Sequence, residues 1–426
     1  MEKIIKIEGG RIFDPATGKN GSFDIRMEGN LITAVDKPGS FGKPGSHEQI
    51  IDAKAMWIMP GLVDMHVHLR EPGEEYKEDL QSGLGAAAAG GFAAVCCMPN
   101  TKPANDNRAI TQMLIRRARE IGRSNLYPIA AITMGREGRT PVEMGDLLDA
   151  GAVAFSDDGS SVPCSAVMRR ALEYASSFDA LIIEHAQDAD MTMGGVSHEG
   201  EVGTRAGLGG MPAEAEEIIV ARDIILARMT GARLHIAHVS TPRSVELIRR
   251  AKDEGIRVTA EVTPHHLLLN DAVTADYDTN TKVNPPIRPE EYRLALINAL
   301  KKGIIDVVAS DHAPHSVLEK EGTFGAAAFG IGGLETTAAL MLKLVDEGHL
   351  KPMDMAAALA TNPCRILGLD GGKIAAGSVA NITILNPEQP YTIDPSKFIS
   401  KGKNTPFGGW KVPGRPHMTI CEGKII

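Results

Sequence analysis

Histidines stand at the ends of several short apolar runs in this sequence. His66 and His68 end the first such run with one residue between them, and His185 and His238 end two later runs. On a strand, a spacing of two residues places both imidazoles on the same face. Buried imidazoles need hydrogen-bond partners or a metal ion, and neutral imidazole is a common ligand of divalent metals. This pattern indicates a metal centre.

Aspartates end two further runs, which continue into Ser156-Asp-Asp-Gly159 and Ser310-Asp-His-Ala-Pro-His315. A His-x-His pair alone is a weak signal, and a single histidine that ends a strand is more often a packed core residue. The shared position at strand ends is what favours ligands here. His235 has the opposite parity to His238, which predicts that it points outward or into a neighbouring layer and only packs. His265-His266 is interpreted as packing, or as a neighbour of the site.

The elements that must position these side chains alternate along the middle of the chain. Apolar runs without internal polar alternation are typical of a parallel sheet covered on its outside. Eight such units predict a (β/α)8 barrel over residues 57–366. A doubly wound sheet is the alternative, but its first turn is usually glycine-rich. The expected strands are 62–68, 92–98, 127–133, 152–156, 180–184, 232–239, 256–262 and 305–309. The expected helices include 106–121, 165–177, 213–229, 242–254 and 289–302.

Both ends of the chain have a sequence pattern that differs from that of the middle. Residues 1–56 contain short β-type runs separated by turn-rich pieces, and residues 367–426 resume that pattern among glycine and proline. Chain termini commonly lie close together. We therefore expect one small β-sandwich domain that is assembled from both termini, with the barrel inserted between its halves.

Composition excludes several classes of protein. The chain has 426 residues, 43% of them hydrophobic and 23% charged, which is ordinary for a globular protein. The 45 basic against 54 acidic residues give a net charge of −9, which disfavours nucleic-acid and anionic-membrane surfaces. The start lacks the pattern of a signal peptide, and the longest apolar stretch is too short for a membrane span. Five scattered cysteines without a C-x-x-C pair predict reduced thiols in a cytoplasmic protein.

Five segments carry a family resemblance: Asp64-Met-His-Val-His-Leu-Arg70, Met98-Pro-Asn-Thr101, Phe155-Ser-Asp-Asp-Gly159, Lys282-Val-Asn-Pro-Pro-Ile-Arg288 and Asp311-His-Ala-Pro-His315. They resemble the amidohydrolase superfamily and, within it, the dihydroorotase family in its longer bacterial form. The likeness extends to Asn404-Thr-Pro-Phe407, near the end of the chain. It implies a metal-dependent hydrolase that interconverts (S)-dihydroorotate and N-carbamoyl-L-aspartate in pyrimidine (UMP) biosynthesis.

The resemblance also implies the ligand set His66, His68, Asp158, His185, His238 and Asp311. The choice of Asp158 over Asp157 rests on the family pattern alone. Histidine and carboxylate ligands without cysteine suit Zn²⁺, one or two ions per subunit, with Mn²⁺ or Co²⁺ as substitutes. The sequence has no lysine between Lys102 and Lys252. This excludes the carboxylated lysine that bridges two metals in hydantoinases at the end of the fourth strand.

Substrate-binding residues are expected beside the metal. Arg70 follows His68 by two residues, and its guanidinium suits a substrate carboxylate. The resemblance adds His68, Asn100 and His315 near the carboxylate, and Asn284, Phe329 and Gly330 at the ring. Asp311 is expected to accept the proton of the nucleophile and pass it to the leaving nitrogen. Residues 316–332 look flexible and are interpreted as a lid.

Two alternatives remain open at this point. The chain could be another cyclic amidase, such as a hydantoinase or allantoinase, for which Arg70 has no evident use. It could instead be a non-catalytic scaffold for aspartate transcarbamoylase, although such a scaffold is expected to have lost metal ligands and all six are present. The sequence leaves open whether the chain forms a homodimer and whether it forms a complex with aspartate transcarbamoylase.

Overall fold

Eight short apolar runs form the parallel strands of a barrel in the computed structural model, which describes residues 3–42, 45 and 47–426. Each strand pairs with the next along the chain, in the order β17-β16-β15-β12-β11-β10-β9-β8. Their bounds are β8 Leu62–Val67, β9 Phe92–Cys97, β10 Asn125–Ala130, β11 Ala154–Ser156, β12 Leu181–Glu184, β15 Arg233–Ile236, β16 Val258–Val262 and β17 Val307–Val308. This order confirms the predicted (β/α)8 architecture.

The first and last strands close the ring through a few contacts just beyond β17. Val67 and His312 form a parallel bridge, and the His68 amide donates to the His312 carbonyl at 2.8 Å. The Ser310 amide donates to the Asp64 carboxylate at 3.1 Å. Closure therefore ties the His-x-His strand directly to the segment that carries Asp311.

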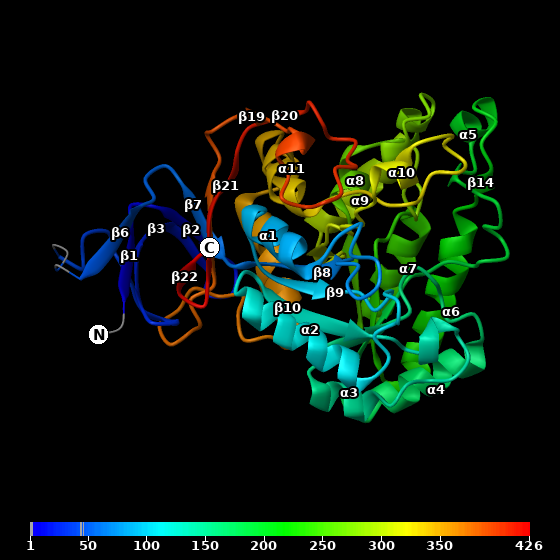
Figure 1. Ribbon diagram of the computed structural model, residues 1–426, viewed down its shortest axis with the longest axis horizontal. Helices are drawn as coiled ribbons and strands as arrows, with labels where there is room; N and C mark the ends of the chain where they lie inside the picture. The colour runs from blue at the N-terminus through cyan, green and yellow to red at the C-terminus, as the bar shows by residue number, and fades with distance from the viewer. Residues whose placement is uncertain (1–2, 43–44, 46) are drawn as a thin grey trace.

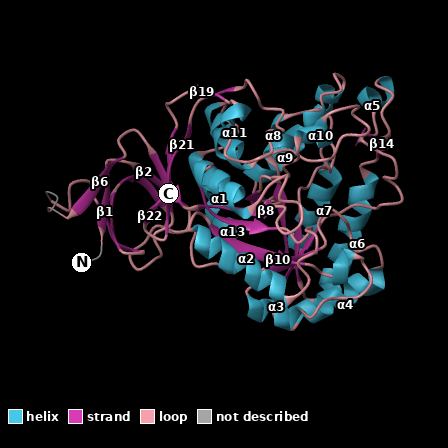
Figure 2. Cartoon of the chain, viewed as in Figure 1, coloured by secondary structure: helices cyan, strands magenta, loops and turns pink. Residues whose placement is uncertain are grey.

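Helices cover the outside of the barrel (Figure 2). The five predicted helices are confirmed, with ends that differ by at most two residues from the expected ones. The helices that follow the strands are α1 Leu80–Ala89, α2 Arg108–Ile121, α3 Met144–Ala150, α4 Ser165–Ser176, α6 Glu214–Thr230, α7 Pro242–Asp253, α9 Glu290–Lys301 and α11 Leu334–Asp346. Local signals set their ends: the Asn107 side chain caps α2, and α2 stops at Gly122, which has a φ of 63°.

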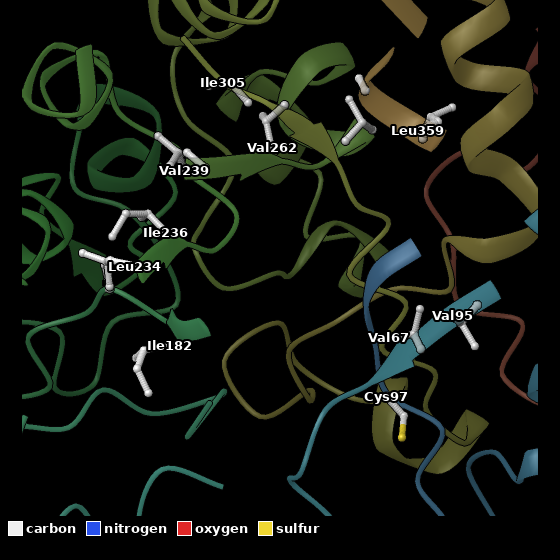
Figure 3. Close-up of a cluster of buried hydrophobic side chains, with 14 of the residues drawn as sticks. Val67, Val95, Cys97, Ile182, Leu234, Ile236, Val239, Val262, Ile305 and Leu359 are labelled. Atoms are coloured by element: carbon white, nitrogen blue, oxygen red, sulfur yellow. The ribbon is translucent and has the colours of Figure 1, made fainter. Parts of the chain in front are cut away.

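The main core lies between the strands and these helices (Figure 3). Leu234 and Ile236 of β15 belong to this core. His235 lies between them in sequence and instead bonds to groups on β16 inside the barrel. Alternation along β15 thus sends Leu234 and Ile236 outward to the helices and His235 inward, whereas the opposite faces of other strands contribute a second apolar cluster that includes Cys96, Ile183 and Val307.

Two sheets built from both ends of the chain form a β-sandwich beside the barrel (Figure 1). One sheet has the order β5-β4-β1-β6 and the other β22-β21-β18-β7-β2-β3. Isoleucines such as Ile5, Ile25, Ile382 and Ile420 fill the space between them. The strands are β1 Ile4–Glu8, β2 Arg11–Asp14, β3 Lys19–Ser22, β4 Asp24–Glu28, β5 Leu31–Asp36, β6 Glu48–Asp52, β7 Trp57–Pro60, β18 Ile382–Asn386, β21 Arg415–Cys421 and β22 Lys424–Ile425.

Several short elements lie outside this simple plan. The largest excursion separates β12 from α6 and contains β13 Ser197–His198, α5 Glu201–Arg205 and β14 Gly210–Met211. The others are the 3-10 turns Met134–Arg136, Asp271–Thr274, Thr279–Thr281 and Pro395–Lys397, the helices α8 Pro264–Leu268, α10 Val317–Lys320, α12 Pro352–Ala356 and α13 Asn362–Leu367, the π-helical turn Ala357–Thr361, and the strands β19 Tyr391–Thr392 and β20 Lys411–Val412. No helix in the described part of the chain has the length and apolarity that a membrane crossing requires.

Candidate metal centre

The six predicted ligands converge at the carboxyl ends of the barrel strands. His66 lies on β8, and the other five follow strands: His68 after β8, Asp158 after β11, His185 after β12, His238 after β15 and Asp311 after β17. All six side chains are buried. Residues from five strands therefore meet at one point, as expected for a barrel whose functional groups gather at this face.

Asp158 lies at the centre of two triads. Its Oδ1 is 3.2 Å from His66 Nε2, and its Oδ2 is 3.5 Å from His68 Nε2. On the other side, Asp158 Oδ1 is 3.6 Å from His185 Nδ1 and 3.7 Å from His238 Nε2. The potential ligand atoms of each triad lie within 4.8 Å of one another. Two ligands of one tetrahedral Zn²⁺ lie about 3.4 Å apart, so both triads have the spacing of a metal site.

Asp311 contacts the first triad. Its Oδ1 is 3.1 Å from His68 Nε2 and 3.5 Å from His66 Nε2. Asp311 and His238 have positive φ angles of 47° and 31°, and Arg70 has one of 61°. Left-handed backbone is uncommon for residues other than glycine, and such strain clusters at functional sites. His238, which has a positive φ, points its side chain towards the centre. His235, three residues earlier, also points into the barrel.

Two buried atoms in the centre have no hydrogen-bond partner among the described residues: His66 Nε2 and Asp158 Oδ1. The Nδ1 atom of His66 is 2.7 Å from a carboxylate oxygen of Glu261. An ionised carboxylate only accepts, so Nδ1 carries the proton and Nε2 presents a lone pair. Two acceptor atoms then face each other at 3.2 Å, which is favourable only with a cation or a proton between them. The donor set therefore fits a divalent metal.

Electrostatics favour the same conclusion. Burial lowers the pKa of His66, but Asp158, Asp311 and Glu261 outweigh burial and hold that pKa well above its usual value. Burial raises the pKa of Asp158, but the surrounding imidazoles, His66 above all, hold it well below its usual value. The carboxylates are thus ionised at neutral pH, and the negative charge that attracts a proton also attracts a divalent cation.

The structure separates Asp157 from Asp158. Asp157 Oδ1 accepts from the Ile132 and Thr133 amides at 2.8 and 3.0 Å, so it fixes the segment after β10 and faces away from the triads. The choice of Asp158, which the sequence could not make between neighbours, is the one that the geometry favours.

Three of the four histidines also bond through the ring nitrogen that faces away from Asp158. The pairs are His66 Nδ1 with Glu261 Oε1 (2.7 Å), His68 Nδ1 with Asn100 Oδ1 (2.8 Å) and His185 Nε2 with Gln187 Oε1 (2.8 Å). Such contacts fix the tautomer and orientation of a metal-binding imidazole. Sequence reasoning missed Glu261 and Gln187.

A cavity of about 210 Å³ opens above the centre. Every residue predicted to bind substrate lines it: His68, Arg70, Asn100, Asn284, His315, Phe329 and Gly330. The Arg70 Nε donates to the Pro314 carbonyl at 3.2 Å, and its Nη2 is 3.3 Å from His315 Nε2. His315 Nε2 donates to the Phe329 carbonyl at 2.7 Å. Burial and the neighbouring Arg70 lower the pKa of His315 to about 3, so its imidazole is neutral.

The remaining histidines near the centre have other partners. His235 bonds to Thr259 Oγ1 at 2.8 Å and to Glu261 Oε2 at 3.2 Å. His266 bonds to Thr263 at 2.7 Å, and the His265 ring packs against it with centroids 4.6 Å apart. His235 lies inside the barrel one layer below the ligands, because Glu261 connects it to His66.

A closed parallel barrel that gathers four histidines and two aspartates at the carboxyl ends of its strands defines the amidohydrolase class. Comparison with known proteins narrows this class. A family model described as dihydro-orotase-like matches residues 55–244. The chain is 47% identical over 422 residues to a dihydroorotase of Syntrophus aciditrophicus, with 99% of each chain covered. It is 48% identical over 420 residues to one of Geobacter metallireducens, covering 99% of this chain and 98% of the relative. The chain belongs to the dihydroorotase family.

Solved structures place the fold among related cyclic amidases. An L-hydantoinase (dihydropyrimidinase) from Arthrobacter aurescens superposes with a TM-score of 0.89 at 25% identity, covering 100% of this chain and 96% of that one. A dihydropyrimidinase from Brevibacillus agri superposes with a TM-score of 0.82 at 21% identity, covering 99% and 95%. The second likeness concerns the fold alone. Asp158 stands after β11 in this chain, where the sequence has no lysine to carboxylate.

Proposed function

We propose that this chain catalyses the reversible hydrolysis of (S)-dihydroorotate to N-carbamoyl-L-aspartate, a reaction of de novo pyrimidine (UMP) synthesis. One observation carries the proposal: five of the six candidate ligands and the Arg70 guanidinium line the same cavity. The substrate combines a hydrolysable ring amide with a carboxylate, and the cavity offers a partner for each. The dihydroorotases to which the chain is nearly half identical support the same reaction over a hydantoinase or allantoinase activity.

The proposed cofactor is Zn²⁺, with Mn²⁺ or Co²⁺ as substitutes. His66, His68, Asp158, His185, His238 and Asp311 would hold one or two ions, and the sharing of Asp158 by two triads supports two. When bound, zinc supplies Lewis acidity to the carbonyl and lowers the pKa of water to about 7. The barrel contributes fixed ligands on separate strands, so the site needs little rearrangement to bind the ion.

Asp311 is the proposed proton carrier. Burial raises its pKa, but His66 and His68 outweigh burial and hold the pKa well below its usual value. The carboxylate is therefore ionised, and in the proposed role it accepts the proton of the attacking water. As the amide bond breaks, the ring nitrogen becomes the terminal NH2 of the carbamoyl group and needs a proton, which Asp311 returns to it. This role requires a carboxylate that faces both the metal ligands and the cavity, as Asp311 does.

The remaining cavity residues would bind and orient the substrate. Arg70 offers the free edge of its guanidinium to the carboxylate, with Asn100 and His315 beside it. Asn284 and the backbone at Phe329 and Gly330 would hold the ring amide. Fixed positions for both ends of the substrate bring the scissile carbonyl to the metal ligands and lower the entropic part of the barrier.

Metal removal tests this function. The purified full-length chain is assayed by the loss of dihydroorotate absorbance before and after dialysis against a chelator, and again after addition of Zn²⁺. We expect activity to disappear with the metal and to return with it, and we expect hydantoin and allantoin to be poor substrates. A metal-loaded protein that leaves dihydroorotate unchanged would contradict the proposal and favour a scaffold role.

Three further parts of the interpretation are proposals of the same kind. We infer that residues 1–56 and 367–426 constitute one domain and residues 57–366 another, with the boundary strand β7 Trp57–Pro60 paired within the sandwich sheet. We infer a cytoplasmic location, which the five unpaired cysteines support. Self-association, or association with aspartate transcarbamoylase, is tested by analytical ultracentrifugation of the chain alone and of a mixture of the two proteins.

A further inference from the structure

Glu261 is a fully buried carboxylate beneath the candidate metal centre. It lies on β16, whereas His66 lies on β8, with β17 between them in the barrel wall. The two side chains nevertheless meet at 2.7 Å. A contact between strands that are not neighbours passes through the barrel interior, so Glu261 occupies the layer directly below the ligands.

The contacts of Glu261 reach both triads. Its Oε1 accepts from His66 Nδ1 at 2.7 Å and from the backbone amide of His238 at 3.4 Å. His66 belongs to the first triad and His238 to the second. One carboxylate oxygen therefore orients the ring of one candidate ligand and the backbone of another.

The second oxygen of Glu261 is also held in place. Its Oε2 is 3.2 Å from His235 Nε2, and His235 Nδ1 is 2.8 Å from Thr259 Oγ1. Because a carboxylate only accepts, His235 donates through Nε2, and its Nδ1 accepts the hydroxyl proton of Thr259. The resulting chain runs from Thr259 through His235 and Glu261 to His66. It leaves the carboxylate no freedom to turn away from the ligand.

Glu261 differs in charge from the other partners of the candidate ligands. His68 and His185 bond to the neutral amides of Asn100 and Gln187, whereas His66 bonds to an anion. A carboxylate that accepts from an imidazole fixes the tautomer and makes the other ring nitrogen a stronger donor to a metal. In His66 this other nitrogen is Nε2, which faces Asp158 without a described partner. Its strength as a donor to a metal is therefore increased.

We propose that Glu261 is a positioning residue that fixes His66 as a strong ligand and thereby sets much of the affinity of the centre for its divalent cation. This inference rests on the proposed metal-dependent function. Glu261 does not line the substrate cavity, so its effect is on metal binding and not on substrate binding.

The test is the zinc dissociation constant of the full-length chain, measured by competition with a chromophoric chelator. Glu261→Gln keeps the shape of the side chain and removes its charge. We expect zinc binding to weaken by about 10- to 100-fold, with KM for dihydroorotate unchanged once zinc is saturating. Urea unfolding of both metal-free proteins separates this effect from a loss of stability.

Glu78→Gln is the matched control. Glu78 is also fully buried and also bonds to an imidazole, that of His312 at 3.3 Å, but it contacts none of the six candidate ligands. We expect the zinc affinity of the Glu78→Gln variant to stay within about twofold of that of the wild type. Glu261→Asp is the second variant if Glu261→Gln does not fold, because it keeps the charge but withdraws it from His66 by one methylene.

The outcomes are distinguishable. A wild-type chain that binds no zinc overturns the proposed function and this inference with it. A wild type that binds zinc, together with a folded Glu261→Gln or Glu261→Asp variant of equal affinity, overturns this inference alone. Equal weakening in Glu78→Gln also overturns it, because the effect then comes from any buried carboxylate.

Discussion

Arg70 is a buried guanidinium without a carboxylate partner within 4 Å among the residues that the structure describes. Its Nε bonds to the Pro314 carbonyl, and its Nη2 lies beside His315. An unpaired buried charge is unfavourable, and the backbone of Arg70 has a positive φ. Both the unpaired charge and the positive φ of Arg70 occur at the wall of the cavity. An anionic ligand that pairs with the guanidinium would explain why these unfavourable features are retained.

The first prediction follows from this geometry. Arg70→Met should raise KM for dihydroorotate by tenfold or more, or about 1.4 kcal/mol at least, because the substrate carboxylate loses its partner. Arg70→Lys should recover only part of the loss, since an ammonium cannot form the two parallel bonds of a guanidinium. Steady-state kinetics at saturating zinc measure both variants. An unchanged KM in Arg70→Met would remove the assignment of a carboxylate substrate.

The candidate ligands could be predicted from the sequence because each one ends an apolar run, and parallel strands end at the same face. Glu261 was missed although it left a signal. In the run 256–262, Arg257, Thr259 and Glu261 alternate with apolar residues, and a carboxylate inside a buried strand needs a partner. The sequence cannot say which residue that partner is, since β17 and the segment around it lie between β16 and β8 in the wall.

At the scale of elements, residues 316–332, the expected lid, are held by contacts with an earlier part of the chain. The Lys282 ammonium donates to the carbonyls of Gly325 and Ala327 at 2.9 and 2.7 Å and lies 4.4 Å from the Phe329 ring centroid. The Gly330 amide donates to the Lys282 carbonyl at 2.9 Å. The glycines and alanines of the segment predict flexibility, and the sequence gives no sign that a lysine some forty positions earlier in the chain bonds to it.

A second prediction concerns this anchor. Lys282→Met keeps the length of the side chain but removes its donors, so the carbonyls of Gly325 and Ala327 lose their partners. We expect faster proteolysis within 316–332 and a several-fold higher KM, because Phe329 and Gly330 form part of the cavity wall. Limited proteolysis followed by mass spectrometry measures the first effect. Lys343→Met is the control, since Lys343 on α11 pairs with Glu347, just past the end of that helix and away from this segment.

The two effects test different parts of the interpretation. Unchanged proteolysis in Lys282→Met would show that the ammonium does not order the segment. Faster proteolysis with an unchanged KM would show that Phe329 and Gly330 do not contact the substrate.

The strands and outer helices were predictable because their periodicity is local, and their observed ends lie close to the expected ones. The excursion between β12 and α6 was not predictable in this way. Its short strands β13 and β14 pair only with each other. The buried Arg288 guanidinium holds the excursion through the Met211 carbonyl and His198, each at 3.0 Å. A segment held in part by a distant side chain leaves no periodic pattern in its own sequence.

At the scale of the whole molecule, buried hydroxyl groups are among the contacts that join the β-sandwich to the barrel. The Thr383 hydroxyl on β18 donates to the Gly91 carbonyl at 2.7 Å and accepts from the Leu62 amide at 3.1 Å. The Thr419 hydroxyl on β21 donates to the Ala88 carbonyl at 2.6 Å. Leu62 begins β8, the strand that carries His66 at its other end. Both threonines belong to the last part of the chain, which packs beside the first (Figure 1).

Thr383→Val should therefore loosen the junction without touching the active centre. Valine has the same shape as threonine, but it leaves the Leu62 amide and the Gly91 carbonyl unpaired in a fully buried place. Each unpaired group costs about 1–3 kcal/mol, so we expect the free energy of unfolding to fall by about 2–6 kcal/mol in a urea titration. Thr419→Val, which removes a single bond, should lose roughly half as much.

The activity of Thr383→Val decides whether the β-sandwich only stabilises the barrel or also aligns its first strand. Zinc affinity and kcat equal to those of the wild type, below the unfolding transition, would mean that closure at Val67 and His312 is sufficient to place His66 and His68. A lower zinc affinity in the folded variant would mean that the strand is positioned from both ends. We expect the first outcome, because the hydrogen bonds of β8 with β9 and of His68 with His312 remain in the variant.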